Sequence, residues 1–442
     1  MTDKVSRVGG RFVAAAPAAD IEAARVVASA TGHVVWLDSG ANSLDSPLRS
    51  MVAVRTSPRA VLTQAVDGDR VWAALDDAHA RDSAQCPHPD LGWVGYVAYE
   101  AGVLADAGLV SQSVDDPVIV AASVDAAWVS DDRGARWVAG ADTEEGALAL
   151  LNEVREAAFA AELPPPPAPL VMQAPKSERW HATAVAHVLD QIVAGRVYQA
   201  CLTFPLLFSP QADLLPHYLA LREASPGAYG AYLRLPGVEA ASTSPERFLH
   251  IDGRLVRSRP MKGTRPRGAT LEEDAALCEQ LLDSEKDRAE NIMIVDLMRN
   301  DLGRVCEIGS VTVPELFAVE TYATVHQMTS TVEGRLRAEV GPFECLKASF
   351  PPGSMTGAPK IAACEILDHL EHGPRGLYAG TVFRLGFDGR HDFSVVIRTL
   401  QNRSGETRWD IGGGIVADSS AADEWDEAMA KANALRAAGL LR

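Results

Sequence analysis

One lysine of the sequence, Lys262, lies between a proline turn and a glycine in the segment 259–265, which reads RPMKGTR. A glycine lets the backbone approach a ligand closely, because it carries no side chain. A lysine amine can act as a covalent nucleophile where its surroundings keep it partly neutral. Exposed loop lysines are the rule, so the turn alone leaves a solvated lysine as the alternative.

A first pair of carboxylates belongs to the helical pattern over 285–301. Asp287 and Glu290 are three residues apart and share a helix face, which continues through the apolar Ile294 and Leu297. Carboxylates on a core-facing stripe are costly unless a cation or hydrogen bonds compensate them. The alternative is an ordinary solvated acidic turn at a helix start, where the helix dipole favours acids.

A second acidic helix follows Ser420, which forms a capping-box pattern with Asp423. Glu424, Glu427 and Lys431 then fall on one face at spacings of three and four. Two helices that each present a pair of carboxylates can form an oxygen site for Mg²⁺, which takes a few carboxylates, waters and ligand oxygens. An exposed acidic helix with a surface Glu427–Lys431 pair is the alternative.

Three consecutive glycines, Gly412, Gly413 and Gly414, interrupt the apolar run 411–416. Glycines weaken a strand, and their usual reason is close approach of the backbone to a ligand or to another segment. Backbone amides there could hold a carboxylate, as in anion-binding nests. A bulge or a tight bend explains the glycines equally well.

Three single residues have weaker signals. Glu246 follows a proline just before an expected strand, which by itself is weak evidence. His326 and Arg398 lie in apolar, β-branched runs. A buried arginine needs an anionic partner, whereas a lone histidine is more often structural. The glycine-rich turn 350–360 lacks the spacing of a P-loop and reads as a helix start.

The elements that must position these residues follow from hydrophobic periodicity. It predicts helices over 144–163, 178–195, 271–302, 357–371 and 421–441. It predicts strands over 33–37, 93–99, 197–208, 228–235, 246–258, 329–336, 376–387 and 391–401. Hairpin-like pairs recur among the strands, so we expect an α+β fold in which large antiparallel β-sheets form a sandwich flanked by helices.

A proline-rich segment divides the chain. Residues 164–169 read PPPPAP, which predicts an extended, semi-rigid connector. We therefore expect an amino-terminal region over 1–163, a linker over 164–175 and a catalytic region over 176–442.

Composition excludes several classes of function. The 442 residues have a net charge of −18, so a basic surface for nucleic acid is not expected, and contact with anionic membranes is disfavoured. No apolar run is long enough to span a membrane, and no signal-peptide core opens the sequence. The six scattered cysteines form no CxxC pair, which favours reduced thiols in the cytoplasm over a zinc site. An anionic substrate would need local cationic groups to overcome the acidic field.

These motifs, in this order, resemble the chorismate-utilising enzymes, a family that includes anthranilate, aminodeoxychorismate, isochorismate and salicylate synthases. The resemblance covers nearly all of 176–442. Its anchors are Tyr198-Gln199, 244–248, 260–264, 289–301, His326, 350–360, 412–416 and 424–431. Residues 92–96 and 36–40 resemble more loosely the family's amino-terminal part, where some members hold tryptophan.

The 260–264 turn resembles the aminodeoxychorismate synthase branch, which typically reads Pro-Ile-Lys-Gly-Thr, rather than the Pro-Ile-Ala-Gly-Thr of anthranilate synthases. Here it reads Pro-Met-Lys-Gly-Thr. Two residues depart from the family pattern: Cys201 replaces an asparagine after the Tyr-Gln pair, and Pro352 replaces a glycine. The first could affect ammonia handling or substrate fit, and the second is expected to alter only a turn.

The resemblance implies a role for each candidate residue. Glu290 and Glu427 would hold Mg²⁺, with Asp287 and Glu424 in support. Glu246 would protonate the departing hydroxyl of chorismate, and Lys262 would add to the ring as that hydroxyl leaves. The remaining members of the implied site are a catalytic His326 and the substrate-binding Tyr378, Arg398, Gly412, Gly413, Gly414, Lys431 and Thr264.

The resemblance also implies partners and a product. Ammonia from a separate glutamine amidotransferase subunit would convert chorismate to 4-amino-4-deoxychorismate, for para-aminobenzoate and folate biosynthesis. No glutaminase or pyruvate-lyase module is evident in the sequence. The alternatives are an anthranilate, isochorismate or salicylate synthase, against which Lys262 argues, and a non-catalytic chorismate- or tryptophan-binding subunit. The latter predicts the loss of Glu246, Glu290 or Glu427, all of which are present.

Overall fold

The computed structural model describes residues 3–18, 21–39, 48–62, 68–102, 116–173, 176–322, 325–371, 373–403 and 405–441. Its helices are α1 (Ala23–Ser29), α2 (Gly68–Gln85), α4 (Glu144–Ala160), α5 (Glu178–Val193), α6 (Leu215–Ala224), α7 (Leu271–Asp283), α8 (Glu285–Gly303), α9 (Pro342–Ser349), α10 (Lys360–Glu371), α11 (Ala421–Ala430) and α12 (Asn433–Ala437), with one 3₁₀ turn, η1 (Gly353–Met355).

The strands are β1 (Lys4–Val8), β2 (Arg11–Pro17), β3 (Val34–Asp38), β4 (Leu48–Leu62), β5 (Gly92–Val97), β6 (Ile119–Asp131), β7 (Gly134–Ala141), β8 (Gln199–Phe208), β9 (Tyr229–Leu235), β10 (Val238–Ser244), β11 (Arg247–Asp252), β12 (Leu255–Ser258), β13 (Met261–Pro266), β14 (Thr312–Thr321), β15 (Val325–Arg335), β16 (Gly357–Ala358), β17 (Thr381–Gly386), β18 (Arg390–Val395), β19 (Thr399–Arg403) and β20 (Glu406–Ile415).

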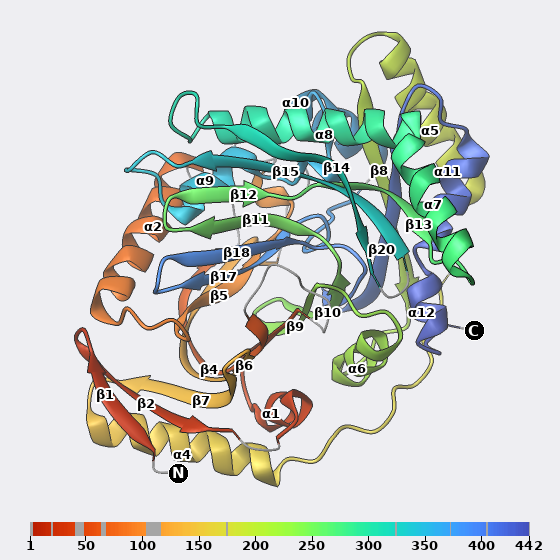
Figure 1. Cartoon of the computed structure of the whole chain (residues 1–442). Helices are drawn as coiled ribbons and strands as arrows, with labels where there is room; N and C mark the ends of the chain where they lie inside the picture. The colour runs from red at the N-terminus through yellow and green to blue at the C-terminus, as the bar shows by residue number, and fades with distance from the viewer. Residues whose placement is uncertain are drawn as a thin grey trace.

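The strands form a layered, antiparallel β-structure with helices on its outer faces (Figure 1). Neighbouring residues of one strand enter two different hydrophobic clusters: Val35 and Met51 belong to the first, and Trp36 and Val52 to the second. Side chains alternate along a strand, so both faces of β3 and β4 are buried. The expected α+β fold with antiparallel sheets flanked by helices is confirmed.

Strands from the two sides of the proline-rich segment pair with each other. Strand β3 pairs with β9, and β5 pairs with β17, both antiparallel. The segment 161–171 carries no regular secondary structure, as the prolines predict. The two regions on either side of the segment therefore share their sheets. The predicted division at residues 163 and 176 stays a prediction about domain organisation.

Two long helical predictions are interrupted in the structure. The pattern over 271–302 breaks at Ser284, where the hydroxyl caps α8 by accepting a hydrogen bond from the Asp287 amide. The pattern over 421–441 divides into α11 and α12. The Ser420–Asp423 cap of α11 is present as predicted, with the Asp423 amide donating to the Ser420 hydroxyl.

The helices that carry the acidic residues lie along the strands that carry Lys262 and the three glycines. Helix α8 packs on β13 and β15, and α11 packs on β20. Figure 1 shows α8 running beside β14 and β15, with α7 and α11 at the same end of the molecule. The two groups of elements also meet, because a Cβ on Gly414 of β20 would lie 3.3 Å from Lys262 Nζ of β13.

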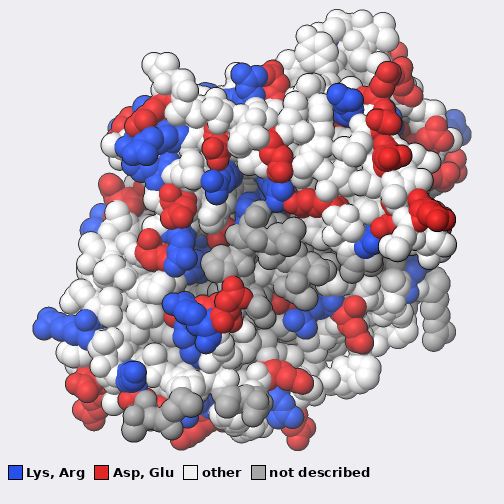
Figure 2. Space-filling model, viewed as in Figure 1, with Lys and Arg blue, Asp and Glu red and all other residues white. Residues whose placement is uncertain are grey.

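Charged side chains of both signs are interspersed over the face seen in Figure 2. All six cysteines are free thiols, and five of them are buried. Within the described part of the chain, no helix is long and apolar enough to cross a membrane.

Candidate active site

The turn that carries Lys262 lies against the first turns of α8. The Lys262 ammonium is 3.5 Å from a carboxylate oxygen of Glu290, and both side chains are mostly buried. The register of β13 with β15 shifts between Met261 and Thr264, so Lys262 lies at an irregularity of the strand. Gly263 has a positive φ of 82°, and a Cβ there would lie 2.8 Å from the carboxyl carbon of Asp287. Only glycine fits this position without strain.

The surroundings of Lys262 favour its charged form. Burial lowers the pKa of Lys262, but Glu290, Cys201, Glu246 and Glu427 together raise it above its ordinary value. Without a bound cation or substrate, Lys262 is therefore an ammonium and not a nucleophile. A nucleophilic role requires the negative charge of the nearby carboxylates to be neutralised first.

Glu246 is the residue immediately before strand β11. Burial raises the pKa of Glu246 to about 7, although a hydrogen bond from Ser354 and the charges of Lys262 and Arg398 lower it. The Ser354 hydroxyl donates to Glu246 Oε1 at 2.8 Å. A carboxyl group with this pKa still holds its proton in a large fraction of molecules at neutral pH, as a general acid must.

Arg398 faces the same region with an unusual backbone, since its φ is 49°. Burial lowers the pKa of Arg398, and Glu246 partly opposes that effect. Among the residues that the structure describes, none forms a hydrogen bond or ion pair with the Arg398 side chain. A largely buried guanidinium in this state can bind an anionic group of a substrate.

Tyr378 is the predicted substrate-binding tyrosine. Its side chain is buried, and burial raises the pKa of Tyr378 well above its ordinary value, so it remains a neutral phenol. Its charged and titratable neighbours include Cys201, Asp410 and Arg375. Its predicted contact with substrate stays a prediction.

The acidic residues of α11 lie close to strand β20, which carries Gly412, Gly413 and Gly414. A Cβ placed on Gly413 would lie 3.0 Å from Glu424 Oε2, 3.8 Å from Glu427 Oε1 and 3.9 Å from Lys431 Nζ. The Ser419 hydroxyl donates to Glu424 at 2.6 Å. Burial raises the pKa of Glu424, and the negative charges of Glu427 and Glu290 raise it further. The carboxylates of α8 and α11 are thus close enough to repel one another.

This donor set fits Mg²⁺. The ion takes one or two protein carboxylates and completes its six oxygen ligands with water and substrate. Within the described ranges, no three His, Cys, Asp or Glu side chains approach closely enough to hold a metal by themselves. A divalent cation would relieve the mutual repulsion at Glu424, which the positive charge of Lys286 already lowers in part. Lys262 and Lys286 lie 3.5 and 3.9 Å from Glu290, respectively.

Asp287 differs from the other three predicted metal ligands. Its carboxylate pairs with Arg265 at 3.0 Å and lies against Gly263. It therefore supports the Lys262 turn directly, and its contribution to a metal site stays a prediction.

The three glycines lie in the regular part of β20, paired with Cys201, Leu202 and Thr203 of β8. A Cβ on Gly412 would lie 2.2 Å from the Leu202 carbonyl, and one on Gly414 would lie 2.5 Å from Gln199 Nε2 and 3.3 Å from Lys262 Nζ. Close approach of neighbouring segments accounts for the glycines, and no bulge interrupts this register. Lys431 donates to the Gly412 carbonyl and pairs with Glu427 at 3.2 Å. Carboxylate binding by the glycine amides and Lys431 stays a prediction.

Thr264 and His326 have protein partners. The Thr264 hydroxyl donates to Gln327 Oε1 at 2.9 Å, and Gln327 Nε2 donates to the Gly263 carbonyl at 2.8 Å. These bonds fix the Lys262 turn on β15. The ring nitrogens of His326 lie 2.9 Å from Thr321 and 2.9 Å from Asp274. The catalytic role of His326 and the substrate contact of Thr264 stay predictions.

One residue of the site has no signal in composition or periodicity. Gln199 is fully buried, and neither atom of its amide has a hydrogen-bond partner among the described residues. An unpaired buried amide is costly, which favours a functional partner. The Tyr198-Gln199 pair could mark it only through the family resemblance, because the run 197–208 otherwise reads as an ordinary apolar strand.

A small pocket of about 60 Å³ lies next to the predicted amino-terminal motif. Leu37, Asp38 and Ser39 line one side of it, and Tyr229 and Asp392 lie on another. Gly40, the last residue of that motif, falls outside the described residues.

Comparisons with known proteins agree with this architecture. A family model described as chorismate binding enzyme matches residues 32–437. The chain is 44% identical over 368 residues to an aminodeoxychorismate synthase of Streptomyces griseus, which covers 80% of this chain and 50% of that protein. It is 43% identical over 246 residues to aminodeoxychorismate synthase component 1 of Escherichia coli, which covers 56% of this chain and 54% of that protein.

A solved structure shows the same fold. Anthranilate synthase component I of Streptococcus pneumoniae superposes with a TM-score of 0.77 at 26% identity, over 90% of this chain and 93% of that one. The chain thus spans about half the length of the two curated relatives and nearly all of the structural one. By the match over 32–437, the chain belongs to the family of chorismate binding enzymes.

Proposed function

We propose that the chain is an aminodeoxychorismate synthase that converts chorismate and ammonia to 4-amino-4-deoxychorismate. The observation that carries the proposal is the position of Lys262, whose buried amine lies 3.5 Å from Glu290 and within electrostatic reach of Glu246. This proximity supports a site at which Lys262 would act as the covalent nucleophile and Glu246 as the general acid. The aminodeoxychorismate synthase relatives at 43–44% identity support the same reaction.

The first step forms a bond between the Lys262 nitrogen and carbon 2 of the ring. The ring double bonds shift, and the bond between carbon 4 and its hydroxyl breaks. Glu246 gives its proton to that hydroxyl, which leaves as water. In the second step ammonia bonds to carbon 4, the double bonds shift back, and the bond to Lys262 breaks. The covalent route divides one difficult substitution into two easier ones.

Other residues bind and orient the substrate. Arg398 interacts electrostatically with Glu246 and would hold a carboxylate of chorismate, with β20 at its three glycines and Lys431 as further candidates. Glu290 and Glu427 would hold Mg²⁺, with Asp287 and Glu424 in support. When bound, the ion neutralises the ring carboxylate and the acidic cluster.

We also propose that a glutamine amidotransferase subunit supplies the ammonia, because the Escherichia coli relative is named as component 1 of its enzyme. Free ammonia would replace the subunit in vitro. The six free cysteines support a cytoplasmic location, because oxidising compartments favour disulfides.

The product formed from chorismate, Mg²⁺ and ammonium tests the proposal. We expect 4-amino-4-deoxychorismate, identified by its mass and ultraviolet spectrum, with the enolpyruvyl group retained. Anthranilate or salicylate would show that pyruvate is eliminated, and isochorismate would show that water is the nucleophile. Any of these as the main product would contradict the proposed function.

A further inference from the structure

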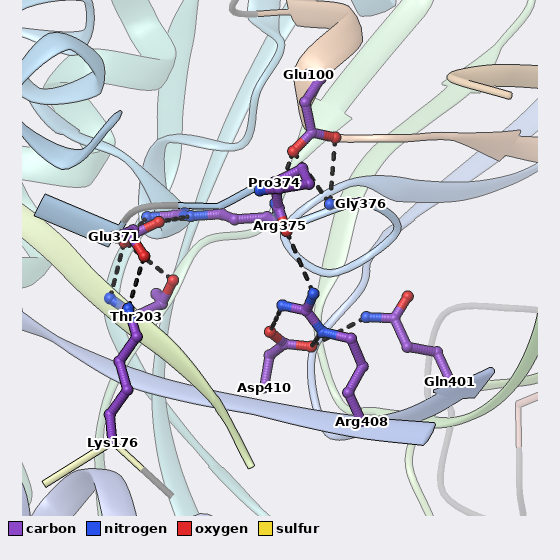
Figure 3. Close-up of polar contacts among 10 residues, drawn as sticks. All are labelled: Glu100, Lys176, Thr203, Glu371, Pro374, Arg375, Gly376, Gln401, Arg408 and Asp410. Atoms are coloured by element: carbon purple, nitrogen blue, oxygen red, sulfur yellow. Dashed lines mark hydrogen bonds and ion pairs between the residues drawn. The ribbon is translucent and has the colours of Figure 1, made fainter. Parts of the chain in front are cut away.

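A buried polar network lies behind the site, and Arg375 is at its centre (Figure 3). Its side chain is only 3% exposed. Its guanidinium donates to both carboxylate oxygens of Glu371, at 2.7 and 2.8 Å, and lies over the ring of Tyr99. Its backbone amide donates to Glu100 at 2.7 Å. Glu371 thus orients a planar fork whose remaining donors point elsewhere.

The remaining donors bond to the main chain of two segments, 353–357 and 199–203, which are called here the two walls of the site. Arg375 donates to the Met355 carbonyl at 2.6 Å and to the Cys201 carbonyl at 2.9 Å. Met355 follows Ser354, whose hydroxyl donates to Glu246. Cys201 follows the buried Gln199 by two residues and interacts electrostatically with Lys262. One side chain therefore joins the turn that hydrogen-bonds to Glu246 to the strand that lies near Lys262.

Other bonds brace the same junction. Glu371 accepts hydrogen bonds from the Thr203 amide at 2.9 Å and from the Thr203 hydroxyl at 3.0 Å. The Cys201 amide donates to the Thr356 carbonyl at 2.7 Å. The two segments thus touch directly, and the Arg375–Glu371 pair bonds to both of them.

We propose that Arg375 is a positioning residue, which holds the main chain at Cys201 and Met355 so that Glu246 and Lys262 keep their relative placement. This inference rests on the proposed function, since it assigns Arg375 a part in that reaction. Misplacement of reacting groups by about 1 Å can cost ~10²-fold in rate, even when the altered residue is remote.

Arg375→Lys tests the proposal. A lysine keeps the positive charge beside Glu371, but it lacks the planar fork that reaches both carbonyls. We expect kcat to fall by ~10- to 10²-fold. KM for chorismate should change by no more than about twofold, because the residues proposed to bind substrate are untouched. Hydrogen exchange should rise in 199–203 and 353–357 more than elsewhere.

Arg136→Lys is the matched control. Arg136 forms a comparable partly buried pair with Asp90 and Asp131, on strand β7, which pairs with β2 and β6. It should lower the melting temperature without lowering kcat. Should Arg375→Lys not fold, Glu371→Gln replaces it: the amide oxygen can still accept from Thr203, but its nitrogen faces the Arg375 Nε–H, and the same two segments should loosen.

Parental kcat in folded Arg375→Lys, or exchange that rises evenly over the whole protein, would overturn the positioning role. If the parental enzyme forms no aminated product, the proposed function is wrong. Exchange in 199–203 and 353–357 then still decides whether Arg375 couples the two walls, since that readout needs no turnover.

Discussion

Glu246→Gln should lower kcat by ~10²–10⁴-fold, the usual contribution of a positioned general acid. Glutamine keeps the shape of the side chain and an oxygen that can accept the Ser354 hydrogen bond, but it has no proton to give to the departing hydroxyl. Chorismate binding, measured by calorimetry, should stay close to that of the parent. Near-parental turnover of the folded variant would exclude Glu246 as the acid.

The same substitution should remove a pH dependence. The pKa of Glu246 is about 7, and the pKa of Lys262 is raised above its ordinary value, so the resting pair above pH 7 is a carboxylate and an ammonium. The reactive pair, a protonated acid and a neutral amine, holds the same number of protons. At a fixed concentration of free ammonia, kcat/KM should therefore be level between about pH 7 and the raised pKa of Lys262, and it should fall below pH 7, where both groups are protonated. If kcat/KM of Glu246→Gln still fell below pH 7, that pH dependence would belong to another group.

Glu290→Gln should lower turnover by ~10³-fold, since a bound cation provides several kcal/mol of charge stabilisation in such reactions. The substitution removes a carboxylate that we expect to hold Mg²⁺ and that lies 3.5 Å from Lys262. Raising the Mg²⁺ concentration should recover part of the activity, whereas chelator should abolish that of the parent. Glu427→Gln should behave in the same way.

The control for Glu290 is Glu285→Gln, which removes the same charge from an exposed position of the same helix. It should leave both turnover and Mg²⁺ affinity near the parental values. Equal Mg²⁺ affinity in Glu290→Gln and the parent, measured by calorimetry, would remove Glu290 from the metal site.

The acidic helices could be predicted from local spacing, because a helix face is set by residues three and four apart. Spacing alone pairs Glu290 with Asp287, and Glu424 with Glu427. It does not show that Asp287 turns to Arg265 and Gly263, because that contact depends on the path of β13. The break at Ser284 escapes the periodicity for a different reason: the hydrophobic pattern continues through the cap, and only the serine signals the interruption.

Gln199 and Arg375 show what local pattern does not contain. Gln199 lies in an apolar strand, and its lack of partners becomes visible only once β8 is packed against β20. Arg375 follows Pro374 in an irregular segment, where an exposed arginine would be the ordinary expectation. Its partners come from Glu100, β8 and the 350–360 turn, so its burial is a property of the tertiary structure.

Covalent attack by Lys262 is the central claim, and intact-protein mass spectrometry with chorismate and Mg²⁺, but without ammonia, tests it most directly. The protein should gain the mass of chorismate less one water, Lys262→Ala should gain nothing, and ammonium should release the adduct as product. An unmodified parental enzyme, together with parental turnover in Lys262→Ala, would contradict the covalent route and leave Lys262 as a charge that orients the substrate.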